Sequence, residues 1–104
     1  MDTLTRLEAT IAGRRDGDPA ASYVAQLLAR GTPALARKLG EEAIEACVAA
    51  LSGSREELVG EAADLVFHLL VLLADKDIPL AEVMAELDRR EGTSGLAEKA
   101  MRSA

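Results

Sequence analysis

The sequence is almost without aromatic residues: Tyr23 and Phe67 are the only two, and tryptophan is absent. A hydrophobic core must therefore come from leucine, valine, isoleucine and alanine, whose small side chains suit close packing of helices. A chain of 104 residues is long enough for one domain and no more. We therefore expect residues 1–104 to form a single domain.

Cysteine and long apolar segments are equally scarce. The single cysteine, Cys47, excludes an internal disulfide, and its place on the apolar side of an expected helix predicts a buried thiol. The longest apolar run, residues 65–74, is interrupted by His68 and is about half of the roughly 20 residues that span a bilayer. The N-terminus lacks the features of a signal peptide. We expect a cytoplasmic protein with no membrane association.

Positive charge is in the minority. Lysine and arginine number 12 against 18 aspartates and glutamates, which gives a formal net charge of −6. An acidic surface disfavours binding to nucleic acid or to anionic membranes, so neither is expected as a partner. If the ligand is itself anionic, the site must supply its own cations.

Apolar residues recur at helical spacing along most of the chain, which predicts an all-α antiparallel helical bundle. Thr32-Pro33 is typical of an N-cap followed by the first helical residue, and Ser54-x-x-Glu57 is typical of a capping box. The two longest helices are apolar over more than half of their circumference, so we expect homodimerisation to complete the bundle. The expected helices cover residues 3–15, 20–30, 33–51, 55–76 and 80–91, with one or two turns in 96–102.

Five carboxylates form two clusters on the two longest helices: Glu41, Glu42 and Glu45, then Glu61 and Asp64. Spacings of three and four residues place each cluster on one helical face, and the short turn at residues 52–54 lets the two faces meet. Facing carboxylates among apolar side chains either raise their pKa values or hold a cation. Oxygen ligands without sulfur select Mg²⁺, with Mn²⁺ as the alternative.

Four other residues have a structural and a functional interpretation. Gly40 interrupts a helix directly before the acids, which suggests close approach of another backbone or a ligand. Ser22 and Tyr23 either cap a helix or carry function, and the structural role is favoured. We interpret His68 as a core histidine with satisfied hydrogen bonds and leave it out of the metal site.

Two acidic motifs and their flanking segments resemble phosphoribosyl-ATP pyrophosphohydrolases, within the wider MazG-type all-α pyrophosphohydrolases. The acidic motifs alone indicate only the superfamily, whereas the Ser-Tyr and Ser-Gly-Leu segments indicate the histidine-pathway family. The resemblance departs from the family at Arg37, where lysine is frequent, and at Phe67, where tyrosine is common. The matching segments are Lys38-x-Gly40-Glu41-Glu42-Ala43-x-Glu45, Glu61-Ala62-Ala63-Asp64-Leu65, His68-Leu69-Leu70, Ser22-Tyr23 and Ser94-Gly95-Leu96-x-Glu98-Lys99-Ala100-x-Arg102.

The resemblance implies hydrolysis of the α–β phosphoanhydride of phosphoribosyl-ATP, the second step of L-histidine biosynthesis. It implies four Mg²⁺ ligands, with Glu41 beside them as a further catalytic carboxylate: Glu42, Glu45, Glu61 and Asp64. For the anionic substrate, Lys38 is the best candidate cation because it lies one turn before Glu42. Further candidates for phosphate binding are Arg14, Arg90, Lys99 and Arg102.

Three other functions remain open. The chain is alternatively a MazG-like hydrolase of another nucleoside triphosphate, or a non-enzymatic helical dimerisation module whose acids are a solvated face. The third alternative, a di-iron carboxylate site, is disfavoured by the sequence, because such sites use Glu-x-x-His motifs and the only histidine here lies seven residues after Glu61.

Overall fold

The computed structural model of the chain describes residues 2–92 and 94–103, and every regular element within them is an α-helix. The all-α prediction is confirmed. No helix in these ranges is long and apolar enough to cross a membrane. The elements are α1 (Thr3–Arg14), α2 (Tyr23–Ala29), α3 (Thr32–Ser52), α4 (Arg55–Asp75), α5 (Leu80–Arg90) and α6 (Gly95–Ser103).

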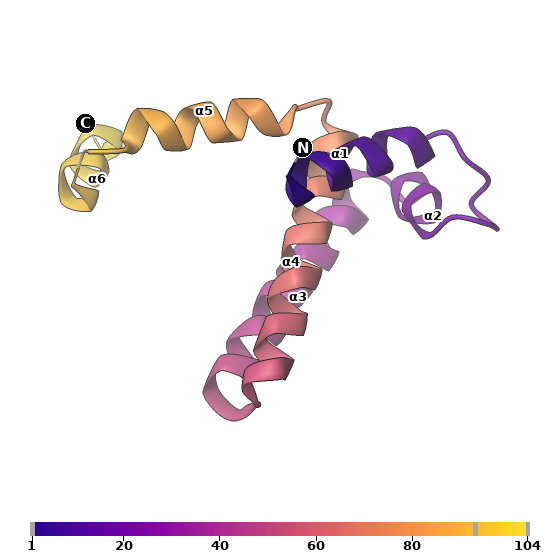
Figure 1. Cartoon of the computed structure of the whole chain (residues 1–104), viewed down its shortest axis with the longest axis horizontal. Helices are drawn as coiled ribbons and strands as arrows, with labels where there is room; N and C mark the ends of the chain where they lie inside the picture. Colours follow the sequence, from indigo (N-terminus) through magenta and orange to yellow (C-terminus); the bar gives the residue numbers. More distant parts are fainter. Residues whose placement is uncertain (1, 93, 104) are drawn as a thin grey trace.

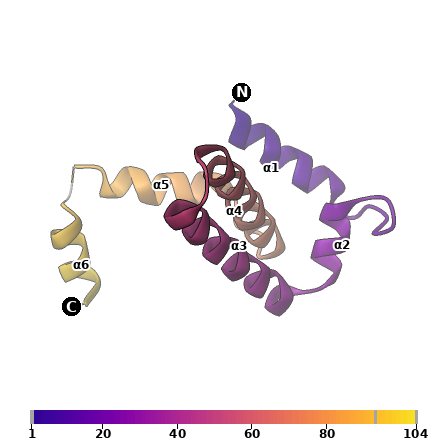
Figure 2. The ribbon, with the colours of Figure 1, turned by 90° about the horizontal axis from the view of Figure 1, so that it is seen from below.

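The two long helices, α3 and α4, form an antiparallel hairpin (Figure 1). At its open end the Thr32 hydroxyl, in the first turn of α3, donates a hydrogen bond of 2.5 Å to Asp75 at the end of α4. Helices α1 and α2 pack against this end, whereas α5 and α6 extend away from the hairpin in both views (Figures 1 and 2). The antiparallel arrangement expected from the short turn is therefore present.

The hydrophobic core lies at the open end of the hairpin, where α1, α2, the first turns of α3 and the last turns of α4 meet. Ile11, Leu27 and Val71 are at most 1% exposed there. The opposite half of the hairpin carries exposed apolar side chains, with Ile44 66% exposed and Val59 63% exposed. The radius of gyration is 15.8 Å, against about 13 Å for a compact chain of 100 residues. The chain by itself leaves these apolar side chains of the hairpin uncovered.

Two helix starts differ from the sequence prediction. Helix α2 begins at Tyr23 and not at residue 20, because the Ser22 hydroxyl accepts a hydrogen bond from the Ala25 N–H and caps the helix. Helix α3 is capped by Gly31, whose φ of 88° suits glycine, and not by Thr32. The Thr32 side chain bonds to α4 instead. The capping box at Ser54 is present, since its hydroxyl accepts from the Glu57 N–H at 3.1 Å.

One further expectation about α3 is wrong within this chain, and another is wrong in part. Cys47 is exposed, not buried, because no helix in the described part of the chain covers the face of α3 that holds it. Gly40 does not mark a close approach of another backbone of this chain, since a Cβ there would meet nothing within 4 Å; the close approach of a ligand stays a prediction. Thr93, in the polar break expected at residues 92–95, lies outside the described residues.

The open-end core predicts the effect of a cavity-forming substitution. We expect Leu27→Ala to lower the free energy of unfolding by about 2–5 kcal/mol, because the side chain is 1% exposed and its removal leaves a cavity. The measurement is urea denaturation followed by circular dichroism. Leu96→Ala, the same change at a residue 84% exposed, should alter stability by less than about 0.5 kcal/mol. Equal effects of the two substitutions would contradict this placement of the core.

Candidate metal and substrate site

The turn between α3 and α4 sets the height at which their acidic residues meet. The Gly53 N–H donates a hydrogen bond of 2.9 Å to the Ala49 carbonyl oxygen. A Cβ at Gly53 would lie 3.0 Å from that oxygen and 3.1 Å from the Ala49 Cα, so a larger residue would displace the turn. The chain then reverses within two residues, and Glu61, in the second turn of α4, comes to lie opposite Glu42 and Glu45 of α3.

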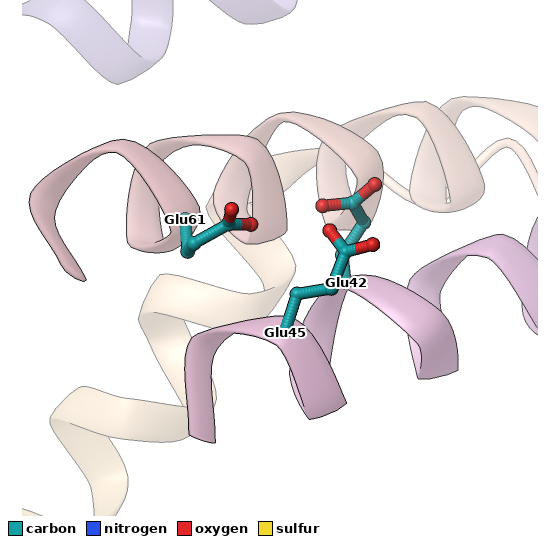
Figure 3. Close-up of side chains that lie close together, drawn as sticks. All are labelled: Glu42, Glu45 and Glu61. Carbon is teal, nitrogen blue, oxygen red and sulfur yellow. The ribbon is translucent and has the colours of Figure 1, made fainter. Parts of the chain in front are cut away.

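Three carboxylates from the two helices converge in this hairpin. Glu42 and Glu45 of α3 and Glu61 of α4 each place one carboxylate oxygen within 4.8 Å of the other two (Figure 3). Glu42 is buried, Glu61 is half-buried and Glu45 is exposed, so the cluster opens to solvent on the Glu45 side. We call these three residues the acidic cluster.

Two oxygens of the acidic cluster lack hydrogen-bond donors. Among the described residues, Glu42 Oε2 and Glu61 Oε2 are buried side-chain atoms without a hydrogen-bond partner. A buried carboxylate oxygen that has lost its hydration and found no donor is costly. An oxygen-binding cation between the helices would satisfy both atoms, and three carboxylate oxygens with no sulfur or imidazole suit Mg²⁺ or Mn²⁺. The residues present therefore fit a hard divalent cation.

The charges around the cluster are only partly balanced. Lys38 Nζ lies 3.2 Å from Glu42 Oε1, and the hydrogen bond to Glu42 raises the pKa of the Lys38 ammonium, which therefore stays charged. Interaction with Glu42 first, and then with Glu61, raises the pKa of the Glu45 carboxyl. Proton binding or cation binding at Glu45 relieves the same repulsion.

Two predicted acids lie beside the acidic cluster and not within it. Asp64 is exposed, one turn after Glu61 on α4, and is not one of the three grouped carboxylates. Glu41 is exposed, with a carboxylate oxygen 3.9 Å from Arg37 Nε. The structure brings together three of the four predicted metal ligands, and the roles of Asp64 and Glu41 remain predictions.

The predicted cations are spread over several elements. Lys38 is joined to the acidic cluster, whereas Arg14 is exposed in the last turn of α1. Arg90 bonds to Glu86 on α5 at 3.0 Å, and hydrogen bonds from Arg89 and Arg90 lower the pKa of Glu86 to about 2. Lys99 and Arg102 lie on α6, which extends away from the hairpin (Figures 1 and 2).

Arg15, which follows Arg14 directly at the end of α1, has a structural role. Its guanidinium donates hydrogen bonds of 2.6 Å to the Ala74 carbonyl and to Asp77, and so ties α1 to the end of α4.

His68 has the structural role expected of it and also makes a contact that was not foreseen. It is 7% exposed, and its Nδ1 lies 2.7 Å from the Asp64 carbonyl oxygen. Its Nε2 lies 3.4 Å from the Tyr23 hydroxyl on α2. No sequence pattern indicates this contact, because the two residues are 45 positions apart and belong to different helices.

The fold and the site define this chain as an all-α protein with three carboxylates gathered between two antiparallel helices. Residues 4–91 match the phosphoribosyl-ATP pyrophosphohydrolase family. A phosphoribosyl-ATP pyrophosphatase of Novosphingobium aromaticivorans is 68% identical over 102 residues, covering 98% of this chain and 95% of the relative. Proteins of the same name from Erythrobacter litoralis and Rhizorhabdus wittichii are 66% and 64% identical, covering 98% and 96% of this chain and 98% and 94% of the relatives. The chain therefore belongs to the phosphoribosyl-ATP pyrophosphohydrolase family, as its motifs predict.

The raised pKa of Glu45 predicts a stabilising substitution. A carboxyl whose pKa is higher in the folded chain than in the unfolded chain favours folding below its unfolded pKa, and this stabilisation is lost as the pH rises through the folded pKa. At neutral pH the ionised Glu45 thus opposes folding. We expect Glu45→Gln to raise the melting temperature in EDTA and to reduce the additional rise caused by Mg²⁺. Thermal denaturation with and without Mg²⁺ measures both.

The matched control is Glu56→Gln. It also removes one negative charge, but from the first turn of α4, outside the acidic cluster. Loss of a carboxylate from a helix N-terminus should leave the melting temperature unchanged or slightly lower, and should keep the full effect of Mg²⁺. A lower melting temperature for Glu45→Gln in EDTA would contradict the electrostatic account of the cluster.

Proposed function

We propose that this chain hydrolyses the α–β phosphoanhydride of phosphoribosyl-ATP, giving phosphoribosyl-AMP and pyrophosphate, the second step of L-histidine biosynthesis. The observation that carries the proposal is the acidic cluster, with its two partnerless buried oxygens, in a chain that belongs to the family of that name. The relatives at 64–68% identity carry the corresponding name. We also propose that residues 1–104 act as one domain in the cytoplasm.

We propose that Glu42, Glu45 and Glu61 hold Mg²⁺, with Mn²⁺ able to replace it, and that Asp64 joins them when the ion binds. The bound ion would neutralise phosphate charge and lower the pKa of a coordinated water. Burial of Glu42 fixes its carboxylate against α4, whereas Glu45 at the open side can follow the ligand. A carboxylate of Glu41 or of the cluster that is not engaged with the ion accepts the proton of the attacking water.

Lys38 supports the reaction from the same helix. Its ammonium is held 3.2 Å from Glu42, at the edge of the acidic cluster, where the phosphates of the substrate would arrive. A fixed positive charge there offsets the negative charge that builds on the leaving pyrophosphate. Arg14, Arg90, Lys99 and Arg102 are proposed as further phosphate contacts. For those on α5 and α6, contact requires movement of these helices or a second copy of the chain.

We propose that the second copy is a homodimer partner. The exposed apolar side chains of the hairpin offer a surface that a monomer leaves in water, and burying it would stabilise association. We expect a mass near twice 11.0 kDa by size-exclusion chromatography with light scattering. Ile44→Lys should shift the protein toward the monomer, because it would bury an unpaired charge, whereas Thr10→Lys should not. A monomeric wild-type protein would contradict the proposal.

The proposed reaction predicts metal-dependent release of pyrophosphate. We expect the purified protein to release pyrophosphate from phosphoribosyl-ATP with Mg²⁺, and to lose this activity in EDTA, because the carboxylates alone repel the substrate. ATP and deoxynucleoside triphosphates are the comparison substrates. Turnover of these at the same efficiency would favour a MazG-like hydrolase of another nucleotide, and no turnover by a folded protein would favour a dimerisation module.

The ligand assignment is tested on the same assay. We expect Glu42→Gln and Asp64→Asn each to lower kcat/KM more than about 100-fold while helical circular dichroism persists, since loss even of an outer-shell group costs about 10–100-fold. Glu56→Gln should retain activity. A near-wild-type rate in either variant would remove that residue from the metal ligands.

A further inference from the structure

The Tyr23 side chain lies outside the hydrophobic core. It is the first residue of α2, and the residues that follow it, Val24, Ala25 and Leu27, supply the buried face of that helix. The Tyr23 side chain remains 51% exposed. Its ring stacks on Phe67 of α4, with centroids 6.1 Å apart and planes 14° apart, and lies edge-on to His68. An exposed aromatic ring is thus held in one orientation by two rings of α4.

The hydrogen bonds of His68 determine which part of the Tyr23 hydroxyl is free. A neutral imidazole has one N–H donor and one acceptor nitrogen. The Asp64 carbonyl can only accept, so the proton lies on Nδ1, 2.7 Å away, and Nε2 is the acceptor. The Tyr23 hydroxyl, 3.4 Å from Nε2, therefore donates its proton to His68. The lone pairs of the phenol oxygen remain for an outside donor.

Tyr23 also lies close to the groups that surround the acidic cluster. Glu42 is the main cause of the raised pKa of the Lys38 ammonium, and Tyr23 is a smaller cause. The histidine that fixes the phenol is bonded to the backbone of Asp64, one turn beyond Glu61. The contact between Tyr23 of α2 and His68 of α4 therefore lies two turns of α4 beyond Glu61, toward the open end of the hairpin.

We propose that Tyr23 is a substrate-recognition residue whose phenol oxygen accepts a hydrogen bond from a sugar hydroxyl of the nucleotide. This assignment rests on the proposed function. A phosphate oxygen is excluded as the partner because it carries lone pairs and no proton, as does the free side of the phenol. A sugar hydroxyl is the donor nearest to the scissile anhydride, since the ribose is bonded directly to the α-phosphate.

The test compares wild-type protein with Tyr23→Phe, which keeps the ring and removes only the oxygen. We expect KM for phosphoribosyl-ATP to rise about three- to tenfold, the range for one neutral hydrogen bond, with kcat within about twofold. The dissociation constant of phosphoribosyl-AMP, measured by calorimetry, should rise by the same factor. The rise in melting temperature caused by Mg²⁺ should be unchanged. Thr10→Val, which deletes a hydroxyl bonded to the Arg6 carbonyl on α1, is the control and should match wild type.

Substrates that lack a hydroxyl identify the sugar. If the donor is the 2′-hydroxyl of the ATP ribose, wild-type protein will prefer ATP over 2′-deoxyATP and Tyr23→Phe will not. If the donor belongs to the second ribose, Tyr23→Phe will lose part of the preference for phosphoribosyl-ATP over ATP. Either result supports the assignment. If the Tyr23 oxygen and the substrate hydroxyl bond to each other, removing the second partner costs no further affinity once the first is gone.

Three outcomes would overturn the assignment. Unchanged KM and unchanged product affinity in Tyr23→Phe would show that the oxygen binds nothing. A fall in kcat together with a smaller Mg²⁺ effect would show that Tyr23 acts on the carboxylates through His68 and Asp64. Absence of turnover by the wild-type protein would reject the proposed function, and this assignment with it, whereas wild-type turnover with an unaffected variant rejects the assignment alone.

Discussion

The antiparallel pairing of α3 and α4 is the constraint on which the rest of the structure depends. It forces Glu42 and Glu45 against Glu61, although like charges at this distance repel. The hairpin is held at one end by the tight turn at Gly53 and at the other by the hydrogen bond from Thr32 to Asp75. Because apolar packing of α1 and α2 stabilises only the open end, the acids can be placed further along the hairpin without entering the core.

This separation of core and site explains why the acidic cluster can be so poorly satisfied. The buried oxygens Glu42 Oε2 and Glu61 Oε2 have no donor, and the Lys38 ammonium is paired with Glu42, one of the three carboxylates. A lysine or arginine side chain in place of a metal ion would neutralise the cluster permanently and leave no room for a phosphate ligand. The proposed divalent cation would offset the cost of bringing the acids together, and its binding would then link folding stability to ligand affinity.

The apolar surface is distributed as unevenly as the charge. Leu51, Ile44 and Val59 are exposed on the half of the hairpin that lies away from the core. The helices that carry Arg90, Lys99 and Arg102 extend from the opposite end (Figure 1). A second chain that covers the hairpin would bury the first surface and would bring new cations toward the acids. One chain brings three of the carboxylates together and, of the predicted cations, places Lys38 beside them.

The sequence by itself determined the helices, the acidic faces and the family, because these depend on local periodicity and short motifs. Spacings of three and four residues put Glu42 and Glu45 together in any α-helix, and Ser54 caps α4 through a contact three residues away. Only the tertiary structure decided that Asp64 stands outside the cluster, that Cys47 is exposed, that Arg15 is structural and that Tyr23 meets His68. Those outcomes depend on the angle and register at which helices pack, and contacts between residues 45 or more positions apart leave no periodic signal in the sequence.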